Sequence, residues 1–185
     1  MTKSQSAKIA TVIKNYPYEE DKKTTELFSK FGNLKRRTHL TKEEAIEILK
    51  WKSPRPLPHY EKNTDAEYRI ITEAAFSTEH EGLKMHTLRA LKGVHYPAAS
   101  AILMFHDPKR YPVIDIRVWQ QLYAIGFVKT NPRGQSFSLD EWLIYLTVMR
   151  EIADEFELPV RHIEKRFFDW HKDEQKKSAR RLYTY

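Results

Sequence analysis

The sequence predicts an all-α fold, and three of its features support this prediction. Apolar residues recur at the three- and four-residue spacing of amphipathic helices, whereas the alternation typical of strands is nowhere sustained. Capping-box sequences mark helix starts at 41–44, 64–67 and 138–141. Five glycines and nine prolines stand singly along the chain and do not form linkers. We expect about seven to nine helices in a single domain.

The first half of the chain contains two of these capping boxes. The box at 41–44 opens a helix that the proline-rich segment 53–58 ends, because proline has no N–H for the helical ladder. The box at 64–67 opens a second helix, whose apolar residues continue to Phe76. Another apolar stripe follows and ends near Leu91. These signals predict three consecutive helices.

Single residues mark the helices that follow. Pro97 suits the first turn of a helix that runs through Phe105. Asp115 is placed to cap the next helix, and Gly126 is placed to end it. The chain is therefore expected to turn between Phe105 and Asp115.

The remaining boundaries define the ends of the domain. The third capping box opens a long helix to about Phe156, and Pro159 starts a last helix. We expect a single helical domain to span 1–185, with 1–40 as an N-terminal extension that packs on it. The segment 172–185 is expected to be a basic C-terminal tail, as a solvated and frayed helix end.

The composition limits the classes of function. The formal net charge of +7 favours anionic partners such as a polyphosphate, although a positive surface also serves solubility alone. The absence of cysteine excludes disulfides, thiolate nucleophiles and cysteine-ligated zinc or iron–sulfur clusters. No window approaches the roughly 20 apolar residues of a membrane span. We therefore expect a cytoplasmic protein, monomeric and without a membrane partner.

No metal site is expected from the histidines. His80, His86, His95 and His106 follow one another at spacings that match no compact pattern of metal ligands. Surface or hydrogen-bonding roles suit these side chains better.

The stretch 91–119 carries the chemistry. It predicts a helix that ends near Leu91, a tight turn around Gly93, and a second helix from Pro97. The start of a helix presents unpaired backbone N–H groups, which can bind a DNA phosphate without reading a base. An ordinary turn between two helices has the same pattern, so the turn alone does not decide the function.

The spacing from this turn to Asp115 adds a resemblance. Residues 91–99 read LKGVHYPAA, and residues 112–119 read PVIDIRVW. Together they resemble the signature of the helix-hairpin-helix (HhH-GPD) DNA glycosylase superfamily, approximately L-P-G-V-G-x-K-T-A, an apolar helix, and P-x-V-D-x-H-V. The all-α pattern on both sides agrees with such a domain. The resemblance implies an enzyme of base excision repair that flips a modified base out of double-stranded DNA and excises it.

The resemblance makes Asp115 the catalytic carboxylate. Cleavage of an N-glycosidic bond builds positive charge on the deoxyribose, which a fixed carboxylate stabilises while it orients or activates water. The positive end of the helix dipole keeps such a carboxylate ionised. A plain helix cap, worth about 1 kcal/mol, is the alternative role, and both roles are compatible.

The resemblance also implies the DNA contacts and the reaction type. Where bifunctional members have a nucleophilic lysine, this chain has Pro97, which implies a monofunctional glycosylase. His95 stands at the second hairpin glycine. Arg117 replaces a histidine, and its side chain could reach a phosphate or form a structural ion pair. The absence of cysteine implies the cluster-free branch, with no cofactor beyond a monovalent cation at the hairpin. The implied DNA-binding residues are Lys92, Gly93, Val94, His95, Tyr96, Pro97 and Arg117.

Two further hypotheses stay open beside the enzyme. One is a catalytically silent helix-hairpin-helix protein that docks on DNA, and the other is a helical interaction protein that uses the same fold. In an enzyme, Asp115 should open onto a pocket beside the hairpin. In a binding protein, it would be packed as a cap without a cavity. Trp51 is the expected wall of the base pocket, whereas Trp119 and Trp142 are expected in the core.

Overall fold

The computed structural model describes residues 1–32 and 34–182, with side chains through residue 177. All regular structure in this part is helical, which confirms the all-α prediction. It comprises ten α-helices and one short 3-10 helix, more than the sequence pattern predicts. The α-helices are α1 (Lys3–Asn15), α2 (Lys22–Phe31), α3 (Lys42–Lys52), α4 (Leu57–Tyr60), α5 (Asp65–Ser77), α6 (Glu81–Leu88), α7 (Tyr96–His106), α8 (Ile116–Ala124), α9 (Leu139–Glu155) and α10 (Val160–Leu182), and the 3-10 helix is η1 (Leu34–Arg36).

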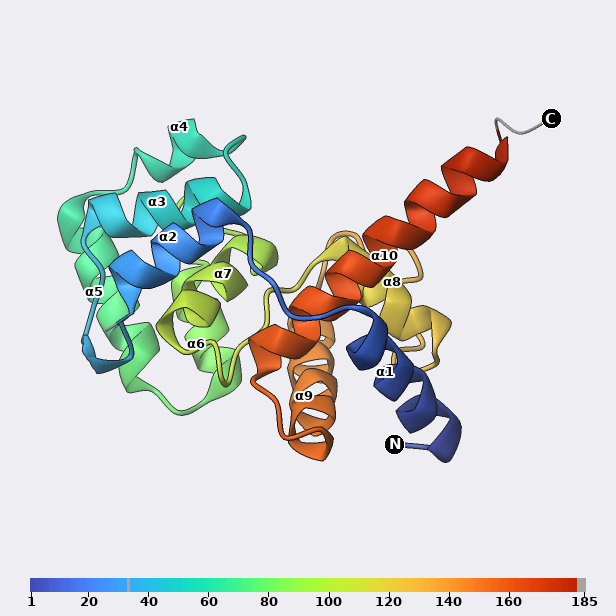
Figure 1. The fold of residues 1–185 in the computed structure, drawn as a ribbon. Helices are drawn as coiled ribbons and strands as arrows, with labels where there is room; N and C mark the ends of the chain where they lie inside the picture. Colours follow the sequence, from blue (N-terminus) through green and yellow to red (C-terminus); the bar gives the residue numbers. More distant parts are fainter. Residues whose placement is uncertain (33, 183–185) are drawn as a thin grey trace.

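The helices form two groups, which lie side by side in Figure 1. The first group contains α2 to α7, where α3 packs against α7 and α5 packs against α6. The second group contains α1, α8, α9 and α10, with α10 packed against the other three. The chain crosses between the groups twice, through residues 16–21 and 107–115. The second crossing leads directly to Asp115.

Local capping explains where the helices begin. The three expected capping boxes are present, at Thr41, Thr64 and Ser138. A fourth box at Thr2 starts α1, and Asp21 caps α2. These two helices were not predicted from the sequence, because few apolar residues mark them. The segment 1–40 thus packs on both groups, with α1 on α10 and α2 on α7.

Helix α7 forms the centre of the first group. Every residue from 98 to 105 is buried, so this helix has no solvent-facing side over that length. Phe105 contacts three aromatic rings from α2 and α3, those of Phe28, Phe31 and Trp51. A helix buried on all sides provides a rigid support for the turn before it and the segment after it.

The second group has its own aromatic core. Trp119 of α8 and Trp142 of α9 are fully buried, which confirms their expected core positions. The indole Nε1 of Trp119 donates a hydrogen bond to the backbone oxygen of Asn131 at 2.8 Å. Trp119 and Trp142 both lie next to the ring of Tyr145. This packing fixes the axis of α8, and with it the position of Asp115 at its start.

Two segments differ in detail from the expectation. The proline-rich segment 53–58 ends α3 at Lys52 but also begins the short helix α4. The basic stretch that begins at residue 172 continues α10 to Leu182, with mostly exposed side chains through 177. Residues 183–185 of the expected tail lie outside the described residues. No helix in the described part is long and apolar enough to cross a membrane.

The connection between α6 and α7, residues 89–95, requires glycine at one position. Gly93 has φ of +82°, and a Cβ there would lie 2.7 Å from the Cβ of His59. We expect Gly93→Ala to lower the free energy of unfolding by about 2–4 kcal/mol, through backbone strain plus overpacking. Gly126, with φ of +77° and open space around it, is the matched control, and Gly126→Ala should cost only about 1–2 kcal/mol. Urea denaturation measures both, and equal losses would contradict the steric argument.

Candidate functional site

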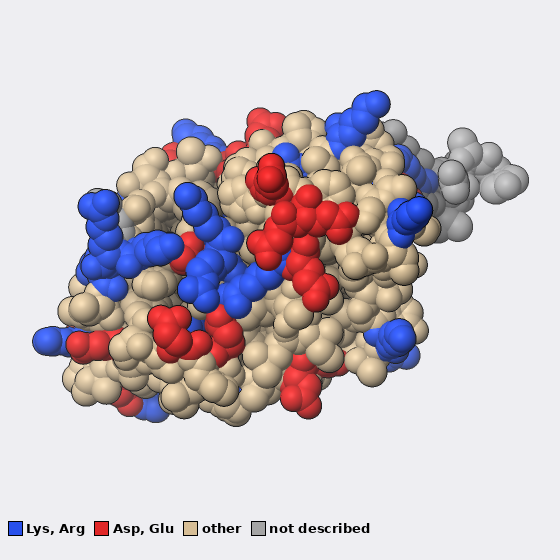
Figure 2. Space-filling view, turned by 90° about the horizontal axis from the view of Figure 1, so that it is seen from below, with Lys and Arg blue, Asp and Glu red and all other residues tan. Residues whose placement is uncertain are grey.

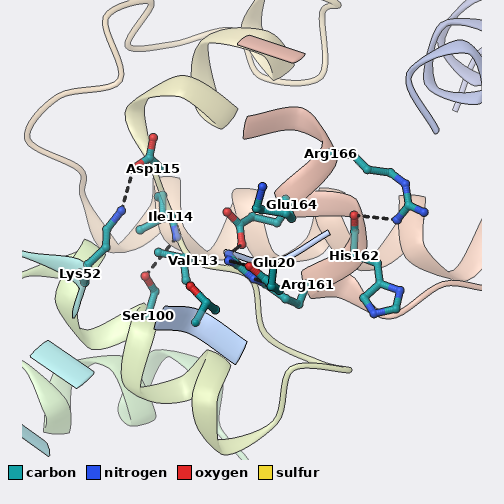
Figure 3. A network of polar contacts seen from close by, with 12 residues as sticks. Glu20, Lys52, Ser100, Val113, Ile114, Asp115, Arg161, His162, Glu164 and Arg166 are labelled. Carbon is teal, nitrogen blue, oxygen red and sulfur yellow. Dashed lines mark hydrogen bonds and ion pairs between the residues drawn. The ribbon is translucent and has the colours of Figure 1, made fainter. Parts of the chain in front are cut away.

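The segment before Asp115 is held from both helix groups. The Oγ of Ser100, on α7, accepts a hydrogen bond from the backbone N–H of Ile114 at 3.0 Å (Figure 3). The hydroxyl of Tyr145, on α9, donates to the backbone oxygen of Val113 at 2.9 Å. These four residues are buried. The backbone that enters α8 is therefore fixed, and so is the origin of the Asp115 side chain.

Asp115 caps α8 and also reaches across to α3. Its Oδ1 accepts the backbone N–H of Arg117 at 2.9 Å, as expected for an N-cap residue. Its Oδ2 forms an ion pair with Nζ of Lys52 at 2.7 Å, shown as a dashed line in Figure 3. The side chains of Lys52 and Asp115 are each 15% exposed. Asp115 is thus a cap and, at the same time, a partly accessible carboxylate.

Two opposing effects set the pKa of Asp115. Burial raises the pKa, while the charge and hydrogen bond of Lys52 and the backbone N–H of Arg117 lower it. The lowering effects prevail, so the pKa of Asp115 lies below its ordinary value of 3.8. The carboxylate is therefore ionised at neutral pH, the state that stabilises a developing positive charge.

Asp115 opens into a pocket between the two helix groups, which we call the Asp115 pocket. Its volume is about 270 Å³, near the lower end of the roughly 300–1,000 Å³ typical of small-molecule sites. This volume suits one compact ring system. The residues that shape it are Trp51 and Lys52 from α3, Asp115 and Arg117 at the start of α8, and Glu164 and Phe168 from α10.

Aromatic rings stand in both groups around this pocket. The indole Nε1 of Trp51 donates to Oγ1 of Thr24 at 2.9 Å, which holds the ring in place. In the other group, the guanidinium of Arg117 lies 5.0 Å from the ring centroid of Phe168. Trp51, Asp115 and Arg117, all expected at the site, therefore line one pocket. Rings in such positions can stack on a planar ligand.

A second carboxylate lies in the same pocket. Glu164 is only 2% exposed and pairs with the buried Arg161, which also binds Glu20 through two nitrogens at 2.7 and 3.0 Å (Figure 3). Burial raises the pKa of Glu164, and the charge of Arg161 only partly offsets this. The environments thus shift the pKa values of Asp115 and Glu164 in opposite directions.

The turn before α7 is held by the segment that follows α4. The side chain of Asn63 is buried and bonds twice to Lys92, with Oδ1 accepting from its N–H at 2.8 Å and Nδ2 donating to its oxygen at 3.2 Å. Gly93 lies against the ring of Tyr60. The expected DNA-contacting Lys92 pairs its ammonium with Glu67 at 3.5 Å, and the expected Val94 is buried.

Backbone donors gather at this turn. The N–H groups of Gly93, His95, Tyr96 and Ala98 donate to none of the described residues. His95 has φ of −105°, so it replaces a glycine there without backbone strain. Free N–H groups at the start of a helix, together with the positive end of its dipole, form an anion-binding surface.

The turn and the start of α8 border a common surface. A second hollow of about 520 Å³ is lined by His95, Tyr96, Pro97 and Ile116, among others. Ile116 directly follows Asp115 in the chain. Ile116 therefore links the hollow at the start of α7 to the start of α8, where Asp115 lies.

The face of the molecule opposite α4 carries charges of both signs. Figure 2 shows that this face carries a group of acidic side chains beside a group of basic ones. Opposite charges also pair directly, since Arg110 and Arg150 both form ion pairs with Glu81. The excess positive charge of the chain therefore does not form one continuous basic surface on that side.

Two of the four histidines considered as metal ligands, His80 and His106, have local structural roles. The Nδ1 of His80 accepts the N–H of Leu83 at 3.0 Å and so caps α6. His106 stacks on Phe76, and burial lowers its pKa to about 4. Within residues 1–32 and 34–177, no group of three or more side chains is arranged to hold a metal ion.

Comparison with known protein families, characterised proteins and solved structures gives no match to this chain. The geometry of the Asp115 pocket and of the turn before α7 is therefore the structural basis for assigning a function.

Lys52 controls the ionisation of Asp115, which gives a direct prediction. In Lys52→Met, burial acts without the opposing charge, so the pKa of Asp115 should rise above its wild-type value. In the wild type, the lowered pKa stabilises the fold above the unfolded-state pKa, and this contribution is lost as pH falls through the folded-state pKa. In the variant this contribution should shrink or change sign.

A carboxyl-carbon NMR titration of Asp115 measures this shift. Lys50→Met is the matched control, because Lys50 lies in the same last turn of α3 but is exposed. It should leave the titration of Asp115 unchanged. An Asp115 titration that is identical in Lys52→Met and wild type would refute the role of the ion pair.

Proposed function

We propose that this protein is a monofunctional DNA N-glycosylase of the base excision repair type, with Asp115 as its catalytic carboxylate. The observation that carries the proposal is the placement of Asp115: an ionised, partly accessible side chain that lines a pocket and directly precedes Ile116, which borders the separate hollow at the start of α7. The resemblance of residues 91–119 to the helix-hairpin-helix glycosylases supports the same function.

The proposed chemistry follows from these positions. The modified nucleotide leaves the DNA stack, which costs a few kcal/mol, and its base enters the Asp115 pocket between Trp51 and Phe168. As the glycosidic bond breaks, its electron pair leaves with the base and the sugar becomes positive. Asp115 stabilises this charge and accepts a proton from the attacking water, and this proton is returned through solvent to the departing base. The products are the free base and an abasic site.

The turn between α6 and α7 would hold the DNA strand. The free N–H groups of Gly93, His95 and Tyr96 are suited to one phosphate of double-stranded DNA. Arg117, exposed at the start of α8, is placed for a neighbouring phosphate. Such contacts release counterions, so binding should weaken with increasing salt.

A catalytically silent DNA-binding protein is the second candidate. The free N–H groups at the turn favour it equally, because they need no catalytic residue. The Asp115 pocket favours the enzyme, since a cap that serves only α8 needs neither a cavity nor a partner lysine.

Substitution of the carboxylate separates the two candidates. A panel of duplexes, each with one modified base, is assayed for abasic-site formation. For the duplex that is processed best, Asp115→Asn should lower the rate of excision at least about 100-fold, because the amide cannot stabilise the sugar cation. DNA affinity should change little, since the proposed phosphate contacts lie elsewhere.

Asp154→Asn is the matched control, because Asp154 is exposed near the end of α9 and does not line the pocket. It should excise at the wild-type rate. DNA binding without abasic sites from any duplex would support the silent binding protein, and excision by Asp115→Asn at the wild-type rate would refute the catalytic role.

The reaction should stop at the abasic site. Position 97 is proline where the bifunctional members have their nucleophilic lysine, and the ammonium of the nearby Lys52 is paired with Asp115 at 2.7 Å. Incubation with an abasic duplex and borohydride, which reduces a Schiff base to a stable amine, should give no covalent protein–DNA complex. A complex that disappears in Lys52→Arg would show lyase chemistry and contradict the monofunctional assignment.

A further inference from the structure

The buried end of the Asp115 pocket presents a hydrogen-bond acceptor without a partner. Oε2 of Glu164 accepts a hydrogen bond from Nη1 of Arg161. Oε1 receives no hydrogen bond from any residue in the described part. It is not one of the fully buried side-chain atoms that lack a hydrogen-bond partner, so part of its surface is accessible. Because Glu164 is 2% exposed and lines the pocket, Oε1 opens into it. In Figure 3 this oxygen lies on the side that faces Asp115 and Lys52.

The donors around this oxygen are already engaged. All three guanidinium nitrogens of Arg161 bond to carboxylates, those of Glu20 and Glu164. The ammonium of Lys52 bonds to Asp115, and that of Lys165 pairs with Asp169. The buried end of the pocket therefore offers a ligand a carboxylate oxygen, beside cations that are each already paired with a carboxylate.

An acceptor in this position distinguishes two kinds of nucleobase. An exocyclic amino group, as on adenine- or cytosine-derived bases, donates a hydrogen bond to the carboxylate. The deaminated counterpart has a carbonyl oxygen at the same position, which would face the carboxylate oxygen with like partial charge. A site built around one hydrogen bond rejects the analogue that cannot form it, because the buried group stays unpaired.

We propose that Glu164 is the base-recognition residue of this site and that it selects bases with an exocyclic amino group over their deaminated, carbonyl-bearing counterparts. This inference rests on the proposed glycosylase function. Trp51 and Phe168 supply stacking that is indifferent to the substituent, so Glu164 supplies the selectivity. Asp115 at the mouth acts on the sugar, and Glu164 at the buried end holds the base.

Matched duplexes test the selectivity. The pairs are 5-hydroxycytosine with 5-hydroxyuracil, 8-oxoadenine with 8-oxohypoxanthine, and 5-formylcytosine with 5-formyluracil, whose members exchange an amino group for a carbonyl group. Single-turnover formation of abasic sites is measured for each. Wherever a pair is processed, the amino member should react at least about tenfold faster.

Glu164→Gln tests the assignment to this residue. The amide can turn its N–H₂ toward the pocket and donate to a carbonyl, so the amino-to-carbonyl rate ratio should fall at least about tenfold. Glu155→Gln, the same change at an exposed position of α9, is the matched control and should keep the wild-type ratio. If Glu164→Gln does not fold, Glu164→Asp keeps a charge for Arg161 but withdraws the oxygen, and it should also lower the ratio.

The outcomes separate this inference from the proposed function. Excision with equal rates for both members, or faster excision of the carbonyl member, overturns the role of Glu164 and leaves the glycosylase standing. An amino preference that survives in both Glu164 variants assigns the selectivity to another residue. No excision of any member of the three pairs or of the wider panel overturns both proposals.

Discussion

The ion pair between Lys52 and Asp115 is the interaction on which the site depends. It joins the end of α3 in one helix group to the start of α8 in the other, at 2.7 Å. Burial alone would raise the pKa of Asp115 and favour its neutral form, and Lys52 reverses this effect. The hydrogen bonds of Ser100 and Tyr145 to the preceding backbone fix where the carboxylate points. Position and charge of Asp115 are therefore set together.

The Asp115 pocket contains two carboxyl groups in contrasting environments. Asp115 lies at the mouth, 15% exposed, with a lowered pKa, whereas Glu164 lies at the buried end with a raised pKa. Pairs of carboxyl groups in contrasting environments commonly take different roles in one reaction. Here the accessible group is suited to the charge on a sugar, and the buried group to a directional hydrogen bond with a base. The turn at Gly93 would add a contact to the strand outside the pocket.

Local signals predicted much of the fold and only part of the site. The capping boxes and Asp115 as an N-cap could be read from the sequence, because each involves residues within one helical turn. Helices α1 and α2 were not predicted, because they are short and contain few apolar residues. Lys52 and Glu164 were missed for another reason. Each resembles an ordinary charge on a helix, and only tertiary packing brings them to Asp115 from elsewhere in the chain.

In the proposed reaction, the Asp115 carboxylate stabilises positive charge on a flipped sugar. The most direct test compares the affinity for two duplexes, one with a cationic pyrrolidine and one with a neutral tetrahydrofuran in place of the same sugar. The wild type should bind the pyrrolidine duplex at least about tenfold more tightly, because it mimics the charge of the transition state. Asp115→Asn should lose this preference. Equal affinity of the wild type for the two duplexes would show that Asp115 does not stabilise positive charge on the sugar.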